Sequence, residues 1–264
     1  MALVLKNLYS FYSYYFHEYE DNRVKGLFLL QSPLPITAIL AVYLYFVNGK
    51  GQMWMKDRKA FKLNTILYAY NATQVLLNLY MGLRFISYIT KFENLFCIPP
   101  PWNDFSKTAL ELRDMSHYYY LVKVLDLLDT VFFILRKKNN QVTFLHIYHH
   151  VIMAIGCYWY IKFFSGGGHA YSLGLINSFV HAIMYGYYLL TSLKPEIKES
   201  IWWKKYITQL QMVQFTILII HFGVPIFTNC SFPKGLLIGV VIQNLFMLFL
   251  FGDFYYKAYV KKKT

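Results

Sequence analysis

The sequence predicts an all-α, polytopic membrane protein in which seven helices cross the bilayer. Composition is the first observation behind this prediction: 57% of the 264 residues are hydrophobic and 20% aromatic, whereas only 15% are charged. Soluble domains are roughly 45–50% apolar and about 25% charged. The second observation is a series of apolar segments, each near the roughly 20 residues that cross a bilayer as a helix. Soluble, disordered, collagen-like and coiled-coil classes are therefore excluded.

Short linkers with no break in composition join the expected spans. We therefore expect one integral-membrane domain over residues 1–264, ending in a basic cytosolic tail at 257–264. The first span contains Pro33 and Pro35 near its start, where a helix tolerates proline best. No apolar stretch ahead of it ends in a small-residue cleavage site, so a removable signal peptide is not expected. The spans are placed at residues 27–47, 63–89, 115–135, 141–163, 169–192, 205–228 and 234–256.

Lysine and arginine residues are unevenly divided between the two ends of these spans. The loops at one end, together with the C-terminal tail, hold 16 of them, whereas the other loops and the N-terminal segment hold 7. The positive-inside rule places the richer side in the cytosol, with the N-terminus in a lumen or outside the cell and the C-terminus in the cytosol. Because topology accounts for most of the net charge of +13, no nucleic-acid partner is expected.

The cysteines give little direct information. Cys97, Cys157 and Cys230 are odd in number and have neither CxxC nor CxH spacing. Neither a disulfide framework nor a thiolate metal site is therefore predicted. The glycosylation sequon that begins at Asn229 lies on a very short loop, so its modification is not expected.

The third span, 115–135, carries a cluster of ionisable and polar residues. An α-helix would bring them within an arc of about 120° over two turns. Because ionisable groups are costly inside a membrane, they are candidates for a functional site. The spacing predicts that the lysine neutralises one or both carboxylates; a salt-bridged face that only fixes packing is the alternative. These residues are Lys123, Asp126, Asp129 and Thr130.

The fourth span, 141–163, carries three histidines at positions i, i+3 and i+4. His146, His149 and His150 therefore point to one side of a helix. A single histidine on an apolar face is usually a core residue. Three of them within five residues instead predict a functional cluster.

The fifth and sixth spans each carry a polar face of their own. In the fifth span, five residues share an arc of about 100°. For the tyrosines and methionine of the fifth span, the alternative interpretation is ordinary packing. For the polar residues of the sixth span, the alternative is interhelical hydrogen bonding without a functional role. The two faces consist of Asn177, His181, Met184, Tyr185 and Tyr188, and of Thr208, Gln211 and Gln214.

These faces lie at one depth in the expected membrane. Counted from the cytosolic ends at 1.5 Å per residue, Asp126, His149, His181 and Gln211 lie very roughly 10–17 Å inside. The opposite halves of the spans are mostly apolar. We therefore expect a polar chamber open to the cytosol and continued by an apolar tunnel, which suits a ligand with a polar head and a long acyl tail.

The motifs resemble those of the ELO family, the very-long-chain fatty acid elongases of the endoplasmic reticulum. The family patterns KxxExxDT, HxxHH, NxxxHxxMYxYY and TxxQxxQ are matched in order, beginning at Lys123, His146, Asn177 and Thr208. The resemblance covers nearly the whole chain. It departs at Asp126, where the family most often has Glu. The resemblance implies a barrel of six spans around an acyl tunnel, with one further span outside.

The resemblance also implies the reaction. A long-chain acyl-CoA and malonyl-CoA would condense to a 3-oxoacyl-CoA two carbons longer, releasing CoA and CO2, with no cofactor and no metal. Because no cysteine lies beside a histidine in the motifs, His149 is the expected acyl acceptor. His146 and His150 would orient it, and His181 with Asn177 would stabilise the oxyanion or enolate.

The remaining site residues of the prediction are expected to bind substrate. Four lysines on the cytosolic side are candidates for the phosphates of CoA, with a purely topological role as the alternative. The expected partners are the two CoA thioesters, membrane lipid and other enzymes of the elongation cycle. The substrate-binding set comprises Lys123, Asp126, Asp129, Thr130, Asn177, Tyr185, Tyr188, Thr208, Gln211 and Gln214, and the four lysines are Lys137, Lys138, Lys204 and Lys257.

Two other functions compete with this one. A membrane di-iron desaturase or hydroxylase also uses HxxHH, but it needs several such clusters and this chain has one. A seven-span receptor or transporter accounts for the number of spans but not for the aligned histidines. The C-terminal residues Lys261, Lys262 and Lys263 resemble a dilysine retrieval signal, which favours the endoplasmic reticulum.

Overall fold

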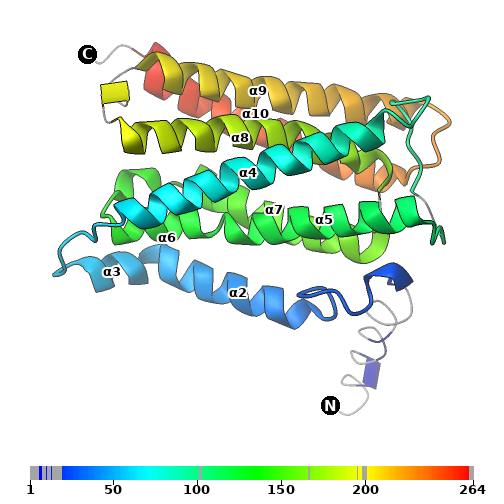
Figure 1. Ribbon diagram of the computed structural model, residues 1–264, viewed down its shortest axis with the longest axis horizontal. Helices are drawn as coiled ribbons and strands as arrows, with labels where there is room; N and C mark the ends of the chain where they lie inside the picture. The colour runs from blue at the N-terminus through cyan, green and yellow to red at the C-terminus, as the bar shows by residue number, and fades with distance from the viewer. Residues whose placement is uncertain are drawn as a thin grey trace. The chain divides into compact units, whose positions relative to one another are not determined.

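The computed structural model describes residues 6, 7, 10, 13, 20–100, 103–165, 167–194, 196, 197 and 201–261. Within this part of the chain all regular secondary structure is helical (Figure 1). The predicted all-α class is therefore confirmed for the described residues. The last three residues of the expected basic tail, 262–264, lie outside them.

Each of the seven expected spans coincides with helix. The main helices are α2 (Pro33–Tyr45), α4 (Asn64–Ile89), α5 (Lys107–Leu125), α6 (Leu128–Leu135), α7 (Phe144–Phe164), α8 (Tyr171–Leu193), α9 (Ile201–Gly223) and α10 (Lys234–Tyr255). The short ones are η2 (Asn22–Val24), η3 (Phe46–Lys50), α3 (Gly51–Met55), η4 (Asn139–Gln141), η5 (Gly168–Ala170), η7 (Val224–Phe227) and η8 (Tyr256–Val260).

Four helical stretches of the described residues are long and apolar enough to cross a membrane. They are Pro33–Met55, Gly168–Leu193, Trp202–Phe227 and Lys234–Val260. Length and composition alone define this set. The expected spans 63–89, 115–135 and 141–163 are not in this set; the second of them is divided into two helices.

Two expected spans have different ends in the structure. The first begins at Pro33 rather than at residue 27, because Ser32 caps the helix by accepting a hydrogen bond from the backbone N–H of Leu34 at 3.2 Å. Proline at the first helical position suits such a start. The third span is divided into α5 and α6 at Asp126 and Leu127. Asp129 N–H donates to the Asp126 carbonyl at 3.1 Å, a 3₁₀-type bond that interrupts the α-helical ladder.

The described residues form two compact units. Unit 1 contains the chain up to Arg58, together with Pro100–Val142 and His150–Gly167. Unit 2 contains Lys59–Pro99, Thr143–His149 and the chain from Gly168 onwards. Helix α7 therefore contributes its first turns, including His149, to unit 2, and the rest, beginning at His150, to unit 1.

Unit 1 contains a buried lysine near the end of α7. Lys162 is fully buried and pairs with the carboxylate of Glu20. Its ammonium group also donates to the backbone carbonyls of Leu30 at 2.9 Å and Gln31 at 3.2 Å. A buried charge needs such partners. The lysine therefore holds the segment before α2 against α7.

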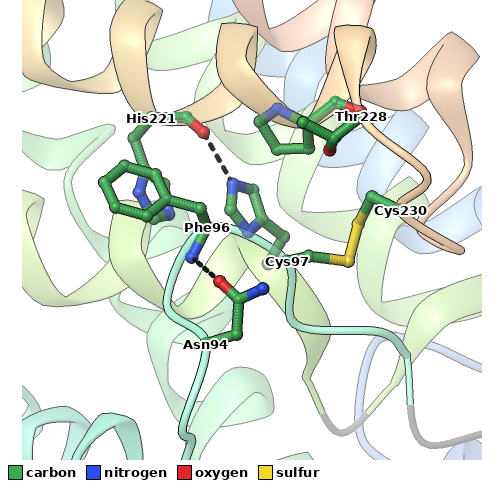
Figure 2. Close-up of a disulfide and its surroundings, with 8 residues drawn as sticks. Asn94, Phe96, Cys97, His221, Thr228 and Cys230 are labelled. Carbon is green, nitrogen blue, oxygen red and sulfur yellow. Dashed lines mark hydrogen bonds between the residues drawn. A yellow bond between two sulfur atoms is a disulfide. The ribbon is translucent and has the colours of Figure 1, made fainter.

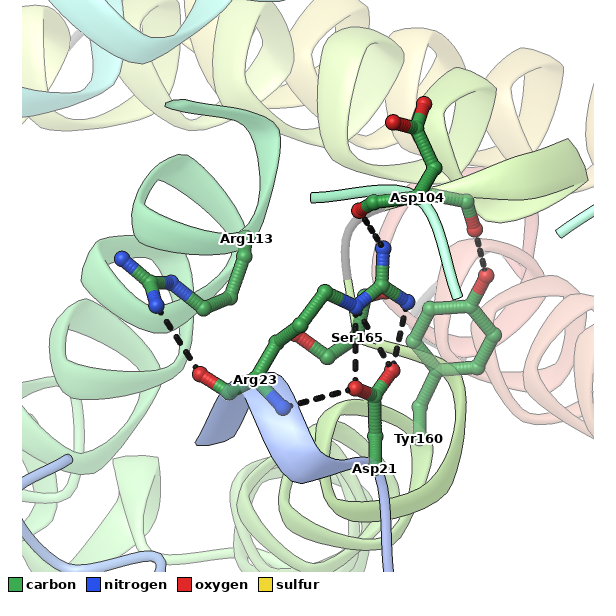
Figure 3. A network of polar contacts seen from close by, with 7 residues as sticks. Asp21, Arg23, Asp104, Arg113, Tyr160 and Ser165 are labelled. Carbon is green, nitrogen blue, oxygen red and sulfur yellow. Dashed lines mark hydrogen bonds and ion pairs between the residues drawn. The ribbon is translucent and has the colours of Figure 1, made fainter. Parts of the chain in front are cut away.

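A second network in unit 1 centres on Arg23 (Figure 3). The guanidinium group pairs with Asp21 at 2.5 Å and donates to the backbone carbonyls of Asp104, at 3.2 Å, and Ser165. The Asp104 carboxylate accepts the backbone N–H of Ser106 at 2.8 Å. This bond, the hydroxyl of Ser106 and the charge of Arg23 lower the pKa of Asp104. Arg23 thus joins three segments that are distant in sequence.

In unit 2, α4 and α8 pack against each other along their lengths. Two glycines allow this approach: a Cβ on Gly82 would lie 3.0 Å from the ring of Phe179, and one on Gly174 would lie 2.9 Å from the ring of Phe85. Helices α9 and α10 also pack together, around Phe215. Small residues at helix interfaces, which let the backbones approach closely, are typical of membrane proteins.

A disulfide in unit 2 corrects the sequence analysis, which predicted none. Cys97 and Cys230 are bonded, with Cα atoms 5.6 Å apart, and they join the segment after α4 to the segment before α10 (Figure 2). The prediction was wrong because spacing along the chain detects only local pairs, whereas these cysteines are separated by 133 residues. Cys157 is free.

Candidate functional site

Unit 1 holds the ion pair that the sequence predicted. Lys123 Nζ lies 3.0 Å from Asp126 Oδ2, and each side chain is only 2% exposed. The ammonium group also lies over the ring of Tyr119, 5.0 Å from its centroid. The carboxylate of Asp126, one methylene shorter than the Glu of the family pattern, thus reaches the lysine one helical turn before it. Local neutralisation of this carboxylate is confirmed.

Thr130 takes part in a contact that the sequence did not predict. Its hydroxyl lies 2.7 Å from the hydroxyl of Tyr43, and both residues are buried. The bond joins α6 to α2. Asp129, beside Thr130 in the chain, is half-buried. No signal singled out Tyr43, because tyrosine is common throughout the expected spans.

The histidines of α7 lie on one continuous helix. His146, His149 and His150 keep the i, i+3, i+4 spacing within Phe144–Phe164, so they share one face. His150 is buried, whereas His146 and His149 are half-buried. His146 and His149 belong to unit 2 and His150 to unit 1.

In unit 2, His181 of α8 lies close to His149 of α7. The ring centroids of His149 and His181 lie 6.3 Å apart. The ring of His181 meets the edge of Tyr185 at 5.9 Å, and Tyr185 meets Tyr188 at 5.9 Å. Asn177, His181 and Tyr185 are buried, whereas Tyr188 is 36% exposed. Of the five predicted residues of this face, three are thus buried, Met184 is half-buried and Tyr188 lies at the surface.

The predicted face of α9 also belongs to unit 2. Gln211 Nε2 lies 3.7 Å from Met184 Sδ and so connects α9 to α8. The hydroxyl of Thr208 donates to the backbone carbonyl of Lys204 at 2.9 Å, within its own helix. Gln214 is buried, and its carbonyl oxygen has no hydrogen-bond partner among the described residues. An acceptor in this state is suited to a ligand donor.

The four candidate phosphate lysines differ in their surroundings. Lys137 and Lys138 are exposed, and Lys137 Nζ donates to the backbone carbonyl of Lys56 at 3.0 Å. Lys204 is half-buried. Lys257 pairs with Asp253 at 2.7 Å on the surface. Of the four, Lys257 already has a carboxylate partner that an anionic ligand would have to replace.

Helix α4 contributes buried polar residues that the sequence analysis missed. Asn71, Gln74 and Asn78 lie on one side of α4 and are at most 5% exposed. The ring of Tyr70, in the same helix, meets the edge of Tyr185 at 6.0 Å. The i, i+3, i+7 spacing of these three amides in an apolar segment was a visible signal, but the stretch from Asn71 to Asn78 contains no ionisable residue that would have drawn attention to it.

Two further histidines of unit 2 lie outside the predicted motifs. One of them, His221, lies near Phe96, the residue before the disulfide-bonded Cys97 (Figure 2). The rings of His169 and His221 stack with centroids 4.0 Å apart, and His169 Nε2 donates to the backbone carbonyl of His221 at 2.9 Å. The in-plane lone pairs of parallel rings cannot converge on one ion. Across the described residues no group of three or more His, Cys, Asp or Glu side chains is arranged to hold a metal ion.

The sequence of the chain is similar to those of known proteins over nearly its whole length. The family model of the ELO family, described as the GNS1/SUR4 family, matches residues 28–264. The chain belongs to the ELO family. A very long chain fatty acid elongase of Aedes aegypti is 37% identical over 100% of this chain and 73% of its own length. Human very long chain fatty acid elongase 4 is 40% identical over 92% of this chain and 77% of the human protein. Very long chain fatty acid elongase 7 of Drosophila melanogaster is 36% identical over 92% of this chain and 74% of the fly protein.

Membership of the ELO family agrees with the helical stretches that can cross a membrane. The chain is therefore a multi-pass membrane protein of this family. The matched region includes every polar face described above, from Asn71 in α4 to Gln214 in α9, and the four candidate lysines.

Proposed function

We propose that this ELO-family chain is the condensing enzyme of fatty acid elongation. It joins a long-chain acyl-CoA to malonyl-CoA and yields a 3-oxoacyl-CoA two carbons longer, CoA and CO2. The family match supports this function, together with relatives whose names are very long chain fatty acid elongases. The reaction uses two thioester substrates and needs neither a resident cofactor nor a metal.

The observation that carries the mechanism is the pairing of His149 with His181 at 6.3 Å. In the first step an imidazole nitrogen of His149 attacks the carbonyl carbon of the acyl thioester, the C–S bond breaks, and the proton that the imidazole loses leaves with CoA as its thiol. In the second step malonyl-CoA loses CO2 and becomes an enolate, which attacks the carbonyl carbon of the acyl-imidazole; the C–N bond breaks, and the imidazole takes up a proton from water to restore neutral His149. Covalent catalysis of this kind divides one difficult step into two easier ones.

Neighbouring groups support the two steps. His146 and His150 orient the nucleophile from the same face of α7. His181 and Asn177 donate hydrogen bonds to the oxyanion or enolate as negative charge develops. The remaining polar residues bind the head of the substrate: Lys123, Asp126, Asp129, Thr130, Tyr185, Tyr188, Thr208, Gln211 and Gln214. The lysines at positions 137, 138, 204 and 257 bind the phosphates of CoA.

We place the enzyme in the membrane of the endoplasmic reticulum, with seven spans, a lumenal N-terminus and a cytosolic C-terminus. Six spans form a barrel around the acyl tunnel. Charge asymmetry supports the orientation. The disulfide gives independent support, because Cys97 and Cys230 both lie on segments assigned to the lumen, and disulfides persist in oxidising compartments.

Elongation by purified protein with labelled malonyl-CoA and a panel of acyl-CoAs tests this function. The wild type should produce chains longer by two carbons, and His149→Ala should abolish both product and the labelled acyl-enzyme. His221→Phe is the matched control, because it keeps a flat ring stacked on His169 outside the proposed site. A normal condensation rate in His149→Ala would refute the assignment of the nucleophile.

A further inference from the structure

The polar side of α4 lies at the same level as the proposed catalytic residues of α8. Three contacts show how the two helices run past each other: Phe85 with Tyr171, Gly82 with Phe179, and Tyr70 with Tyr185. Numbers fall along α4 as they rise along α8, so the two helices are antiparallel. All three contacts lie within unit 2.

The contact of Tyr70 with Tyr185 places Gln74 near the level of the proposed catalytic histidine of α8. Gln74 lies one turn after Tyr70, and His181 lies one turn before Tyr185. Antiparallel neighbours with Tyr70 opposite Tyr185 therefore hold Gln74 and His181 at one level. Gln74 is fully buried.

A continuous series of contacts connects the two residues. Gln74 Nε2 donates to the hydroxyl of Tyr70 at 3.1 Å. The ring of Tyr70 meets Tyr185 edge-on at 6.0 Å, and Tyr185 meets His181 at 5.9 Å. Aromatic rings in edge-to-face contact restrict each other's orientation. The amide therefore sets the position of Tyr70, and the two tyrosine rings pass that constraint to the imidazole.

We infer that Gln74 is a positioning residue for His181, acting through Tyr70 and Tyr185. The inference rests on the proposed function, because it concerns the histidine that stabilises the oxyanion or enolate. A donor that is displaced slightly stabilises the transition state less, whereas substrate binding is unaffected. The effect of Gln74 therefore falls on kcat and not on KM.

The test compares two hydrogen bonds of the same type in unit 2. Gln74→Leu removes the bond to Tyr70. The control, Gln209→Leu, removes the bond from Gln209 Nε2 to the hydroxyl of Tyr255, 2.9 Å long, between α9 and α10. Gln74→Leu should lower kcat about two- to tenfold, the factor that corresponds to the net contribution of one hydrogen bond, with KM unchanged. Gln209→Leu should leave both constants unchanged while losing similar thermal stability.

Tyr70→Phe provides a second variant that keeps the ring and adds no bulk. It should lower kcat by a similar factor, and the double variant Gln74→Leu/Tyr70→Phe should equal either single variant, because both act through one bond. Equal kcat in Gln74→Leu and Gln209→Leu, or multiplied losses in the double variant, would overturn the inference while the elongase function stands. A wild type that elongates no acyl-CoA would overturn the proposed function and this inference with it.

Discussion

The ion pair of Lys123 and Asp126 depends on both residues remaining together. Moving two charges out of water is costly, and their attraction offsets that cost only in a close, well-formed pair. The distance of 3.0 Å meets this condition. The pair can therefore be tolerated in an apolar segment, but neither member alone can.

Removal of Lys123 alone should be strongly destabilising. Lys123→Met leaves the buried Asp126 without this cation, and breaking a buried pair costs about 3–5 kcal/mol. We expect a clear fall in the thermal midpoint in detergent, measured by intrinsic fluorescence, and substantial recovery in Lys123→Met/Asp126→Leu. Lys257→Met, which breaks an exposed pair with Asp253, should change the midpoint little. A single variant at Lys123 as stable as the double variant would contradict this account.

Individual residues differed in how far the sequence could predict them. Lys123 and His149 were singled out by the sequence, because ionisable groups and imidazoles stand out against an apolar background, and the ion pair of Lys123 was found as predicted. Tyr43 and Tyr70 were not, because the chain has 25 tyrosines and their contacts depend on which helices meet. Hydropathy identifies a polar atom in a span but not its partner.

At the scale of elements, the contact of α4 with α8 requires a glycine at position 174. A Cβ there would lie 2.9 Å from the ring of Phe85, which is itself buried. Gly186 lies in the same helix, and a Cβ there would meet nothing within 4 Å. Replacement by alanine is therefore expected to change the stability of the protein in opposite directions at the two glycines.

Gly174→Ala should destabilise the protein, whereas Gly186→Ala should stabilise it slightly. Overpacking a tight contact costs about 1–3 kcal/mol. Alanine at an unobstructed helical position gains up to about 1 kcal/mol over glycine. Thermal midpoints of both variants in the same detergent measure the difference. Equal midpoints would show that the Phe85 ring can move away at little cost.

The positions of the helices were predictable, but some of their ends were not. Length and hydropathy placed all seven expected spans on helix, since an apolar segment of this length has few other structures available. The start at Pro33 and the break at Asp126 depend on single hydrogen bonds. Periodicity is insensitive to such local changes.

At the scale of the whole molecule, the disulfide is the covalent tie that composition did not predict. It closes a loop over a sequence separation of 133 residues. In the chain-entropy model, a loop of this size stabilises the native state by about 5 kcal/mol. The bond is therefore expected to contribute strongly to stability.

Cys97→Ser should lower the thermal midpoint clearly, and a reductant should lower that of the wild type to a similar value. Cys157→Ala should keep the sensitivity to reductant, because Cys157 is free. The measurement is a melting curve with and without a dithiol. An unchanged wild-type midpoint after complete reduction, verified by thiol labelling, would contradict a stabilising role.

The same disulfide also sets a condition on synthesis. At roughly 5–20 residues per second, Cys97 precedes its partner by about 7–27 s, since 133 residues separate Cys97 from Cys230. Cys157 is made during that interval and is the first cysteine available for a wrong bond. Cys157 lies within α7, one of the seven spans of the proposed topology, so under that topology the insertion of α7 removes its thiol from the aqueous compartment. Timely insertion of one helix would thus protect the pairing of two cysteines that are made long before and long after it.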